Sequence, residues 1–321
     1  MKKILYITIS LLAICKLSFA KIGNYEYLNH LDVSLGIGTT GFDLDVSMPV
    51  WDIVKVRTGL TYMPKFKYKM RFGMQMGEGD QKIIDENGIP TSKFSRLSGL
   101  MKQIVGYDMQ DNYIDVTAEP FMTQYKLLVD VTPFKNRNWQ LTAGFYLGNR
   151  RIGKAYNRTY EMPTLVVVSM YNSIYKNIEE NNPMISYRGI TINCPDYIRQ
   201  IILSNGKIGV DMGEFRQTGE RYMMEPDNDC MVKANAFVNI FRPYIGFGYS
   251  GVTIPQVPKL KLIFDCGLIF WGGRPDIVMH DGVNLSKDVR NVRGQVGRYL
   301  DIINKFPVYP VLNIKLSYNI F

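Results

Sequence analysis

The sequence predicts an all-β fold, a closed antiparallel transmembrane β-barrel of about eight strands with long outer loops and one short helical segment. Three observations indicate it. Apolar and polar residues alternate through most of the chain, an export signal precedes them, and short and long connections alternate along the chain. No later stretch has the roughly 20 consecutive apolar residues of a membrane helix.

The alternation is clearest between Val54 and Phe72. The even positions are mostly apolar or aromatic, and the odd positions carry six basic side chains: Lys55, Arg57, Lys65, Lys67, Lys69 and Arg71. Successive side chains of a strand point to opposite faces, so one face is apolar and the other is cationic. In a membrane barrel the apolar face meets lipid and the polar face lines the lumen. A secreted lipocalin-like barrel with an apolar cavity is the alternative outside a membrane.

Residues 1–20 have the three regions of a secretory signal: Lys2 and Lys3, an apolar run, and the small residues Ser18-Phe19-Ala20. Cys15 leaves open a lipoprotein anchor. Residues 21–321 are then a single β-barrel domain with a folded insertion at 150–230. The formal net charge of +9 can indicate nucleic-acid binding, but this interpretation is weak for an exported protein. A basic lumen or anionic lipid headgroups explain it better.

Period-two alternation predicts eight strands. They are Leu31–Ile37, Phe42–Met48, Val54–Phe72, Phe121–Val131, Trp139–Leu147, Val232–Tyr249, Leu260–Phe270 and Val308–Ile320. Between the first two, Thr39–Gly41 is compatible with a tight turn or a glycine bulge, and the strand count depends on which one forms.

The remaining segments are predicted from composition and spacing. Gly73–Tyr113 is polar and glycine-containing, and is expected to be a long loop. The insertion shows helical spacing after Pro163 and again from Pro195 to Leu203, and Ser286–Lys305 has helical spacing with Ser286 as a plausible N-cap. Short turns follow Met48, Phe134 and Tyr249, whereas long segments follow Phe72, Gly148 and Trp271. This asymmetry is typical of barrels with short periplasmic turns and longer outer loops.

Three cysteines follow the export signal. Cys194 and Cys230 lie in one polar region and are predicted to form a disulfide in an oxidising compartment. Cys266 lies in an apolar strand and is expected to be a small buried or lipid-facing residue. With only His30 and His280 and no Cys-x-x-Cys pair, no metal site or cofactor is predicted.

Several short motifs resemble an uncharacterised family of outer-membrane β-barrel proteins of Gram-negative bacteria. They are Gly38-Thr39-Thr40-Gly41, Leu128-Val129-Asp130-Val131-Thr132-Pro133-Phe134, Pro243-Tyr244-Ile245-Gly246-Phe247-Gly248, Asp265-Cys266-Gly267-Leu268-Ile269-Phe270-Trp271-Gly272 and Tyr309-Pro310-Val311-Leu312. The resemblance covers roughly half of the chain after the signal. It implies an outer-membrane barrel and no particular activity. The terminal Phe321 also resembles the signal read by the barrel assembly machinery, although its position is out of phase with the apolar stripe.

The candidate site residues are charged side chains on the polar face. Six are expected in the lumen: Lys55, Arg57, Lys126, Asp130, Lys261 and Asp265. Four more, Lys65, Lys67, Lys69 and Arg71, form a basic face for anions or lipid headgroups. In the simpler interpretation, Lys55 and Arg57 pair with Asp130 and Asp265 inside a filled barrel, because small barrels are packed with side chains.

These features predict a surface-exposed outer-membrane barrel with a structural or interaction role, and its expected partners are membrane lipid, lipopolysaccharide and the barrel assembly machinery. A narrow porin-like conduit for anionic solutes is the first alternative. A lipid-modifying hydrolase using His280, Asp281 and Ser286 is another, but nothing in the sequence aligns an oxyanion hole with them, and no enzyme is predicted.

Overall fold

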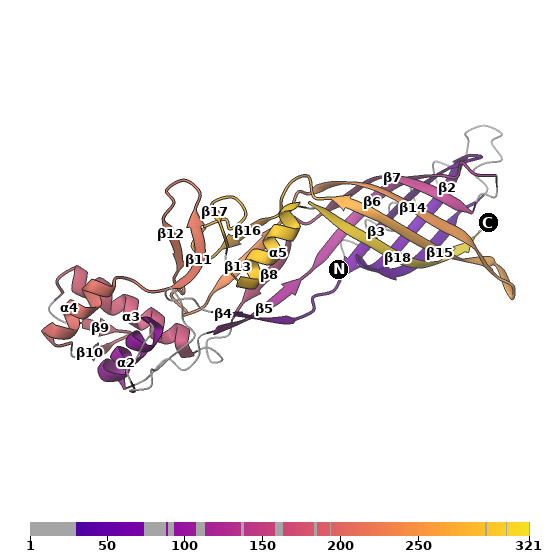
Figure 1. The fold of residues 1–321 in the computed structure, drawn as a ribbon. Helices are drawn as coiled ribbons and strands as arrows, with labels where there is room; N and C mark the ends of the chain where they lie inside the picture. The colour runs from indigo at the N-terminus through magenta and orange to yellow at the C-terminus, as the bar shows by residue number, and fades with distance from the viewer. Residues whose placement is uncertain are drawn as a thin grey trace.

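The computed structural model describes residues 30–73, 88, 93–106, 113–135, 138–157, 163–182, 185–192, 194–292, 294–305 and 307–320. The described chain forms a β-barrel and an elongated extension that leaves one end of it (Figure 1). The predicted export signal lies outside the described residues. Among the described helices, none has both the length and the apolar character needed to cross a bilayer.

Eight antiparallel strands close the barrel, as the sequence predicts. They are β1 (Asp32–Gly38), β2 (Gly41–Trp51), β3 (Val54–Met63), β6 (Met122–Val131), β7 (Trp139–Gly148), β14 (Phe241–Ile254), β15 (Val257–Phe270) and β18 (Val308–Asn319). Their order is β1-β18-β15-β14-β7-β6-β3-β2, and β1 pairs with both β18 and β2. Closure satisfies every strand edge, which a β-structure in lipid requires.

The Thr39–Gly41 segment is a turn and not a bulge. Gly38 is the register partner of Gly41, so Thr39 and Thr40 alone connect β1 to β2. Gly41 has a φ of +92°, a value that glycine adopts without the steric penalty of a side chain. This turn makes two strands of residues 32–51 and brings the number of barrel strands to eight.

The apolar faces of the barrel strands point outward. Ile37, Ile245 and Leu312 are 59%, 57% and 56% exposed, whereas inward residues such as Asp45, Lys126 and Lys315 are buried. Aromatic pairs lie toward both ends of the β7–β14 pair: Trp139 with Tyr249 at one end, and Phe145 with Phe241 at the other. Apolar exteriors with aromatic girdles are the surface that an outer-membrane barrel presents to lipid.

The extension continues five of the barrel strands as a second sheet. Its strands are β4 (Tyr68–Gly73), β5 (Tyr113–Pro120), β8 (Arg151–Tyr156), β13 (Lys233–Phe237) and β16 (Asp276–Met279). The order β16-β13-β8-β5-β4 repeats that of β15-β14-β7-β6-β3 in the barrel. The stretch from Val54 to Phe72 is therefore two strands, not one. Pro64 follows the end of β3, where a residue without an N–H costs no ladder hydrogen bond.

Beyond this sheet, the described residues form four helices and two small sheets. The helices are α2 (Lys93–Val105), α3 (Pro163–Glu179), α4 (Asp196–Asn205) and α5 (Gly294–Lys305). The small sheets contain β9 (Ile185–Tyr187) with β10 (Ile190–Ile192), and β11 (Val210–Phe215) with β12 (Arg221–Met224) and β17 (Val289–Arg290). A hydrophobic core that includes Leu97, Tyr171, Ile202 and Met224 joins these elements. The extension thus has a core of its own.

Two expectations about these segments were wrong. Gly73–Tyr113 is not a loop throughout, since α2 lies within it and buries Leu97 and Met101. The last helix begins at Gly294, not at Ser286, because Val289 and Arg290 pair with β11 as strand β17. In both cases a tertiary partner, absent from the local pattern, decides the conformation.

Candidate functional site: the charged lumen

Arg57 lies at the centre of a buried network of charges inside the barrel. Its position on β3 points inward, and only 4% of the residue is exposed. One terminal nitrogen donates to Asp130 at 2.8 Å and the other donates to Asp265. A carboxylate oxygen of Asp45 lies 3.9 Å from the guanidinium group. A guanidinium group with carboxylates on both of its terminal nitrogens is held in one orientation.

Two lysines, Lys126 on β6 and Lys315 on β18, extend the network to further strands of the barrel. The Lys126 ammonium lies 3.1 Å from Asp43 and 2.8 Å from Asp45. The Lys315 ammonium lies 2.7 Å from Asp45 and 2.6 Å from Asp265. Each carboxylate that two cations share links strands on different sides of the barrel. The lumen is consequently cross-linked by ion pairs.

Uncharged side chains fill much of the remaining lumen. Leu128, Tyr146, Tyr244, Ile269 and Val311 form a buried cluster there. Glycines on β14 itself and on the neighbouring β15 make room for it, because a Cβ atom at Gly246 or Gly267 would lie 2.3–2.4 Å from the Tyr244 hydroxyl. Close packing of this kind is expected in an eight-stranded barrel.

Arg242 lies in the lumen near the end of the barrel from which the extension leaves. It is fully buried and donates to the Gln124 side chain at 2.7 Å, and to the backbone carbonyls of Asn239 and Asn149 at 2.7 and 2.6 Å. Its guanidinium group lies over the Trp271 ring at 5.5 Å. Trp271 packs in turn with Met122 and Val238. This group lies between the charged network and the extension.

The structure brings together four of the six predicted lumen residues: Arg57, Lys126, Asp130 and Asp265. Lys55 lies nearer the end of β3, is partly exposed and pairs with Asp32 at 3.7 Å. Lys261 is the register partner of the inward-facing Ser317, but it is not part of the buried charge network. Lys261 is exposed near the end of β15, where the β14–β15 hairpin leaves it open to solvent. The alternation predicts which side chains point toward the lumen, but it does not predict where along a strand they become exposed to solvent.

Sequence reasoning missed Asp43, Asp45, Lys315 and Arg242. Asp43 and Asp45 alternate with Phe42 and Leu44, so the same period-two pattern contained the signal for two of them. Lys315 likewise alternates with the exposed Ile314 and Leu316. Arg242 precedes Pro243 within the predicted Val232–Tyr249 strand, and the structure of β14 places its side chain inside the barrel.

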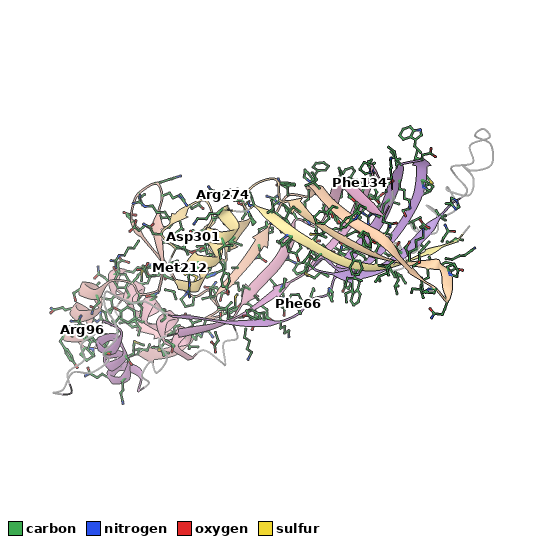
Figure 2. The ribbon with its side chains drawn as sticks, turned by 45° about the vertical axis from the view of Figure 1, so that its right-hand side comes forward. Phe66, Arg96, Phe134, Met212, Arg274 and Asp301 are labelled. Carbon is green, nitrogen blue, oxygen red and sulfur yellow. The ribbon has the colours of Figure 1, made fainter. Side chains whose placement is uncertain are left out.

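The basic residues at the far end of the Val54–Phe72 stretch lie outside the barrel. Lys65 lies over the Phe121 ring at 5.6 Å, and Lys67 is 4.0 Å from Glu119. Lys69 is exposed on β4, and the Arg71 side chain lies outside the described residues. Figure 2 shows Phe66, from the same segment, between the barrel and the extension. These cations therefore do not continue the charged lumen.

The predicted disulfide is also wrong, because Cys194 and Cys230 are both free and buried. The two thiols have different partners in the extension. The Cys230 sulfur lies 3.3 Å from the Tyr187 hydroxyl and accepts from Arg188 at 3.2 Å. Burial raises the pKa of Cys194. A raised pKa disfavours the thiolate that disulfide exchange requires.

His280, Asp281 and Ser286 do not assemble a nucleophile and base. The backbone N–H of Lys233 donates to His280 Nδ1 at 3.4 Å, and Nε2 lies 2.9 Å from the Glu225 carbonyl. Asp281 accepts from the Tyr222 hydroxyl at 2.6 Å. Both imidazole nitrogens are thus engaged by the backbone, and Ser286 is bonded to neither. Within the described part of the chain, no group of three metal-ligating side chains occurs.

No family model matches the chain, and no curated protein matches it. Among solved structures, CarO2 and CarO of Acinetobacter baumannii are each 12% identical with TM-scores of 0.39. The matches cover 90% and 92% of this chain, and 98% and 99% of those chains. A major outer membrane protein of Thermus thermophilus is 11% identical over 90% of this chain and 98% of that one, with a TM-score of 0.29.

These likenesses are too distant to define a family, and the resemblance to an uncharacterised group stays a prediction. The architecture itself is informative. A closed antiparallel barrel with its apolar side chains outside and its charges inside is the form in which β-structure spans a bilayer. The chain is an outer-membrane β-barrel protein.

Proposed function

We propose that this protein is a non-conducting outer-membrane barrel that anchors a folded extension at the cell surface, where the extension meets a ligand or partner. The observation that carries the proposal is the packed lumen. Arg57, Lys126 and Lys315 are each at most 4% exposed and each contacts at least two carboxylates.

Energetics favours a closed barrel over a conduit. Removing one partner of a buried ion pair costs about 3–5 kcal/mol, and a permeating solute would have to separate several pairs at once. Conducting pores instead keep their charges hydrated along a continuous aqueous path. The porin-like alternative therefore has less support than the anchoring role.

The extension has the properties of a recognition module. Its hydrophobic core holds α2, α3 and α4 together independently of the lumen clusters. The short β2–β3, β6–β7 and β14–β15 turns lie at the opposite end, and short turns in outer-membrane barrels are typical of the periplasmic side. Function concentrates in segments that a rigid scaffold positions. In this proposal, membrane lipid, lipopolysaccharide and the barrel assembly machinery are the partners of the barrel itself.

Planar-bilayer recording tests the closed lumen. The purified full chain, inserted into a bilayer and confirmed as folded by heat-modifiable gel mobility, is expected to pass no steady current. A known porin inserted under the same conditions serves as the positive control. A steady anion-selective current from the folded protein would contradict the proposal and favour the conduit.

A further inference from the structure

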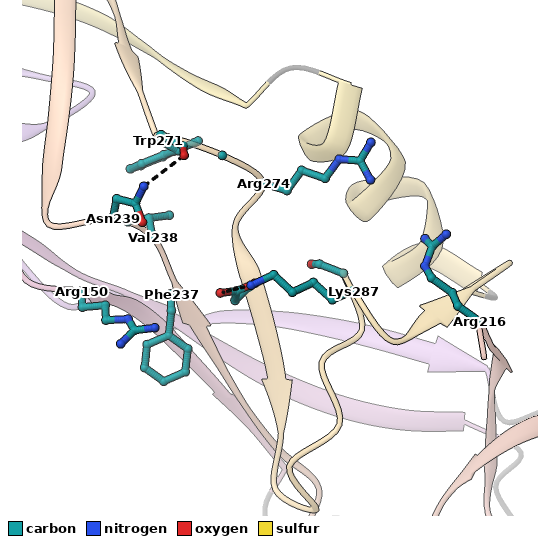
Figure 3. Close-up of a pocket in the computed structure, with 12 residues that line it drawn as sticks. Arg150, Arg216, Phe237, Val238, Asn239, Trp271, Arg274 and Lys287 are labelled. Carbon is teal, nitrogen blue, oxygen red and sulfur yellow. Dashed lines mark hydrogen bonds and ion pairs between the residues drawn. The ribbon is translucent and has the colours of Figure 1, made fainter. Parts of the chain in front are cut away.

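A pocket of about 510 Å³ opens at the base of the extension, beside the outer rim of the barrel. Figure 3 shows that its lining comes from separate segments: the end of β7, the β13–β14 connection, the segment after β15, and the turns after β11 and before β17. Small-molecule sites commonly have volumes of about 300–1,000 Å³. The pocket has the size of a ligand site.

Basic side chains outnumber acidic ones in the lining. Four basic side chains contribute to it: Arg150, Arg216, Arg274 and Lys287. Asp276 is the acidic residue in the lining, and it is already engaged. Lys287 lies 2.8 Å from Asp276, and Asn284 donates to the same carboxylate at 2.9 Å. Burial opposes ionisation of Asp276, but these two hydrogen bonds and the charges of Lys287 and Arg150 hold its pKa below the usual value.

None of the three arginines forms an ion pair with a carboxylate among the residues that the structure describes. Arg150 lies over the Phe237 ring at 6.0 Å, and Arg216 and Arg274 are exposed. In the lumen, by contrast, each lysine and Arg57 has two or more carboxylates. Guanidinium groups bind carboxylate and phosphate oxygens through paired N–H donors. Arginines without ion pairs around one opening therefore favour an anionic ligand.

The floor of the pocket is held rigidly. The Asn239 amide donates to the Gly272 carbonyl at 3.1 Å, and Gly272 has a φ of +74° with no room for a Cβ atom beside Asn239. Trp271 contacts both the Arg242 guanidinium group, at 5.5 Å, and the Tyr309 ring, at 5.4 Å. The pocket thus has a fixed aromatic wall, which reduces the ordering cost of binding.

One further polar group beside the pocket lacks a partner. Ser286 contributes to the lining, and its hydroxyl is buried without a hydrogen bond to any described residue. A buried hydroxyl ordinarily has a partner. This agrees with a site that is completed by a ligand or by water.

We propose that this pocket binds a ligand that carries two or more anionic oxygen groups, phosphate or carboxylate, either free in solution or on a lipid headgroup. The inference rests on the proposed function, because it names the ligand class that the extension meets. The four cations come from different segments that line the pocket, which suits a multiply charged ligand better than a single carboxylate.

The test uses the fluorescence of Trp271 in the full chain. Trp51 and Trp139 are exposed, and Trp51→Phe and Trp139→Phe leave Trp271 as the reporter. The detergent-solubilised protein is titrated with pyrophosphate, with citrate, and with lipid A in mixed micelles, using dephosphorylated lipid A as the control. We expect a saturable change that weakens as salt concentration rises.

The matched variants separate a defined site from general charge attraction. Arg216→Gln with Arg274→Gln is expected to weaken binding by about tenfold or more, the loss expected for a charge-assisted hydrogen bond. Arg96→Gln is the control, because Arg96 is exposed on α2 at the far end of the extension (Figure 2). It should leave binding unchanged. Heat-modifiable mobility verifies that each variant is folded.

Each outcome is informative. A response to pyrophosphate or citrate identifies a free anion, and a response to lipid A alone identifies a lipid headgroup. No saturable response to any probe, or an equal loss in Arg96→Gln, would overturn the inference. A barrel that passes no current and binds none of the probes refutes only this inference. A barrel that conducts refutes the proposed function, and the fluorescence titration then tests the pocket independently.

Discussion

At the scale of single residues, Arg57 determines how the lumen charges are arranged. It joins Asp130 on β6 to Asp265 on β15, two strands that are not neighbours in the barrel. Lys126 and Lys315 complete the network through Asp45, which both contact. A buried carboxylate that loses its cation in a packed lumen is not readily solvated by water. Each cation therefore stabilises the carboxylates around it.

Replacing Arg57 should therefore be costly. Arg57→Ala leaves Asp130 without its cation and Asp265 with Lys315 as its remaining cation, and is expected to lower the free energy of unfolding by about 3–5 kcal/mol. Lys55→Ala, on the same strand and face, should change it by about 1 kcal/mol or less, since the Lys55 pair is partly exposed. Urea unfolding in lipid vesicles, followed by tryptophan fluorescence, measures both. Equal effects of the two substitutions would contradict a buried network.

At the scale of the element, successive side chains of each barrel strand point alternately toward lipid and toward the lumen. On β14, Arg242 and Tyr244 are buried while Phe241 and Ile245 are exposed. The aromatic pairs of β7 and β14 lie toward the ends of the strands, and Ile245 lies between them. This arrangement predicts that Ile245 contacts the middle of the hydrocarbon layer.

A charged residue at position 245 should lower the free energy of unfolding much more than the same residue at the end of the strand. Ile245→Lys is expected to cost about 2–4 kcal/mol of unfolding free energy, the cost of lysine at the bilayer midplane. Ile240→Lys, just before β14, should cost about 0–1 kcal/mol near the interface. Both isoleucines are 57% exposed, so exposure does not distinguish them. Unfolding in vesicles measures the difference, and similar costs would place Ile245 outside the hydrocarbon.

At the scale of the whole molecule, five barrel strands continue past the membrane and carry a second core (Figure 1). Of the barrel strands, only β1, β2 and β18 do not continue into the five-stranded sheet, and the β1–β2 turn is two residues long. The extension therefore rises from one side of the barrel. The short β2–β3, β6–β7 and β14–β15 turns lie at the other end.

Cysteine labelling tests this orientation. Lys176→Cys lies on α3 of the extension and Lys135→Cys lies in the β6–β7 turn, and both lysines are exposed. A membrane-impermeant maleimide should label Lys176→Cys on intact cells and Lys135→Cys only after lysis. The parent protein reports any background, since Cys194 and Cys230 are buried. The reverse labelling pattern would mean that the extension faces the periplasm.

The alternation in the sequence was enough to predict a barrel of about eight strands and the face that meets lipid, whereas the turn at Thr39–Gly41, which sets the number of strands, was decided by the structure. The information in the alternation is local: a strand repeats every two residues, so the chemistry of each face can be read along Phe42–Met48 or Val308–Ile320 without knowing the neighbours. Helical spacing after Pro163 likewise agrees with α3.

Which charges pair with one another depends on the tertiary structure. Arg57 and Asp265 are 208 residues apart, and Lys315 and Asp45 are 270 apart, so their pairing depends on the closure of the barrel. The same holds for Arg150, Arg216 and Arg274, which separate segments bring to one opening. Local alternation specifies the direction of a side chain, whereas its partner is specified by the order and register of strands distant in the chain.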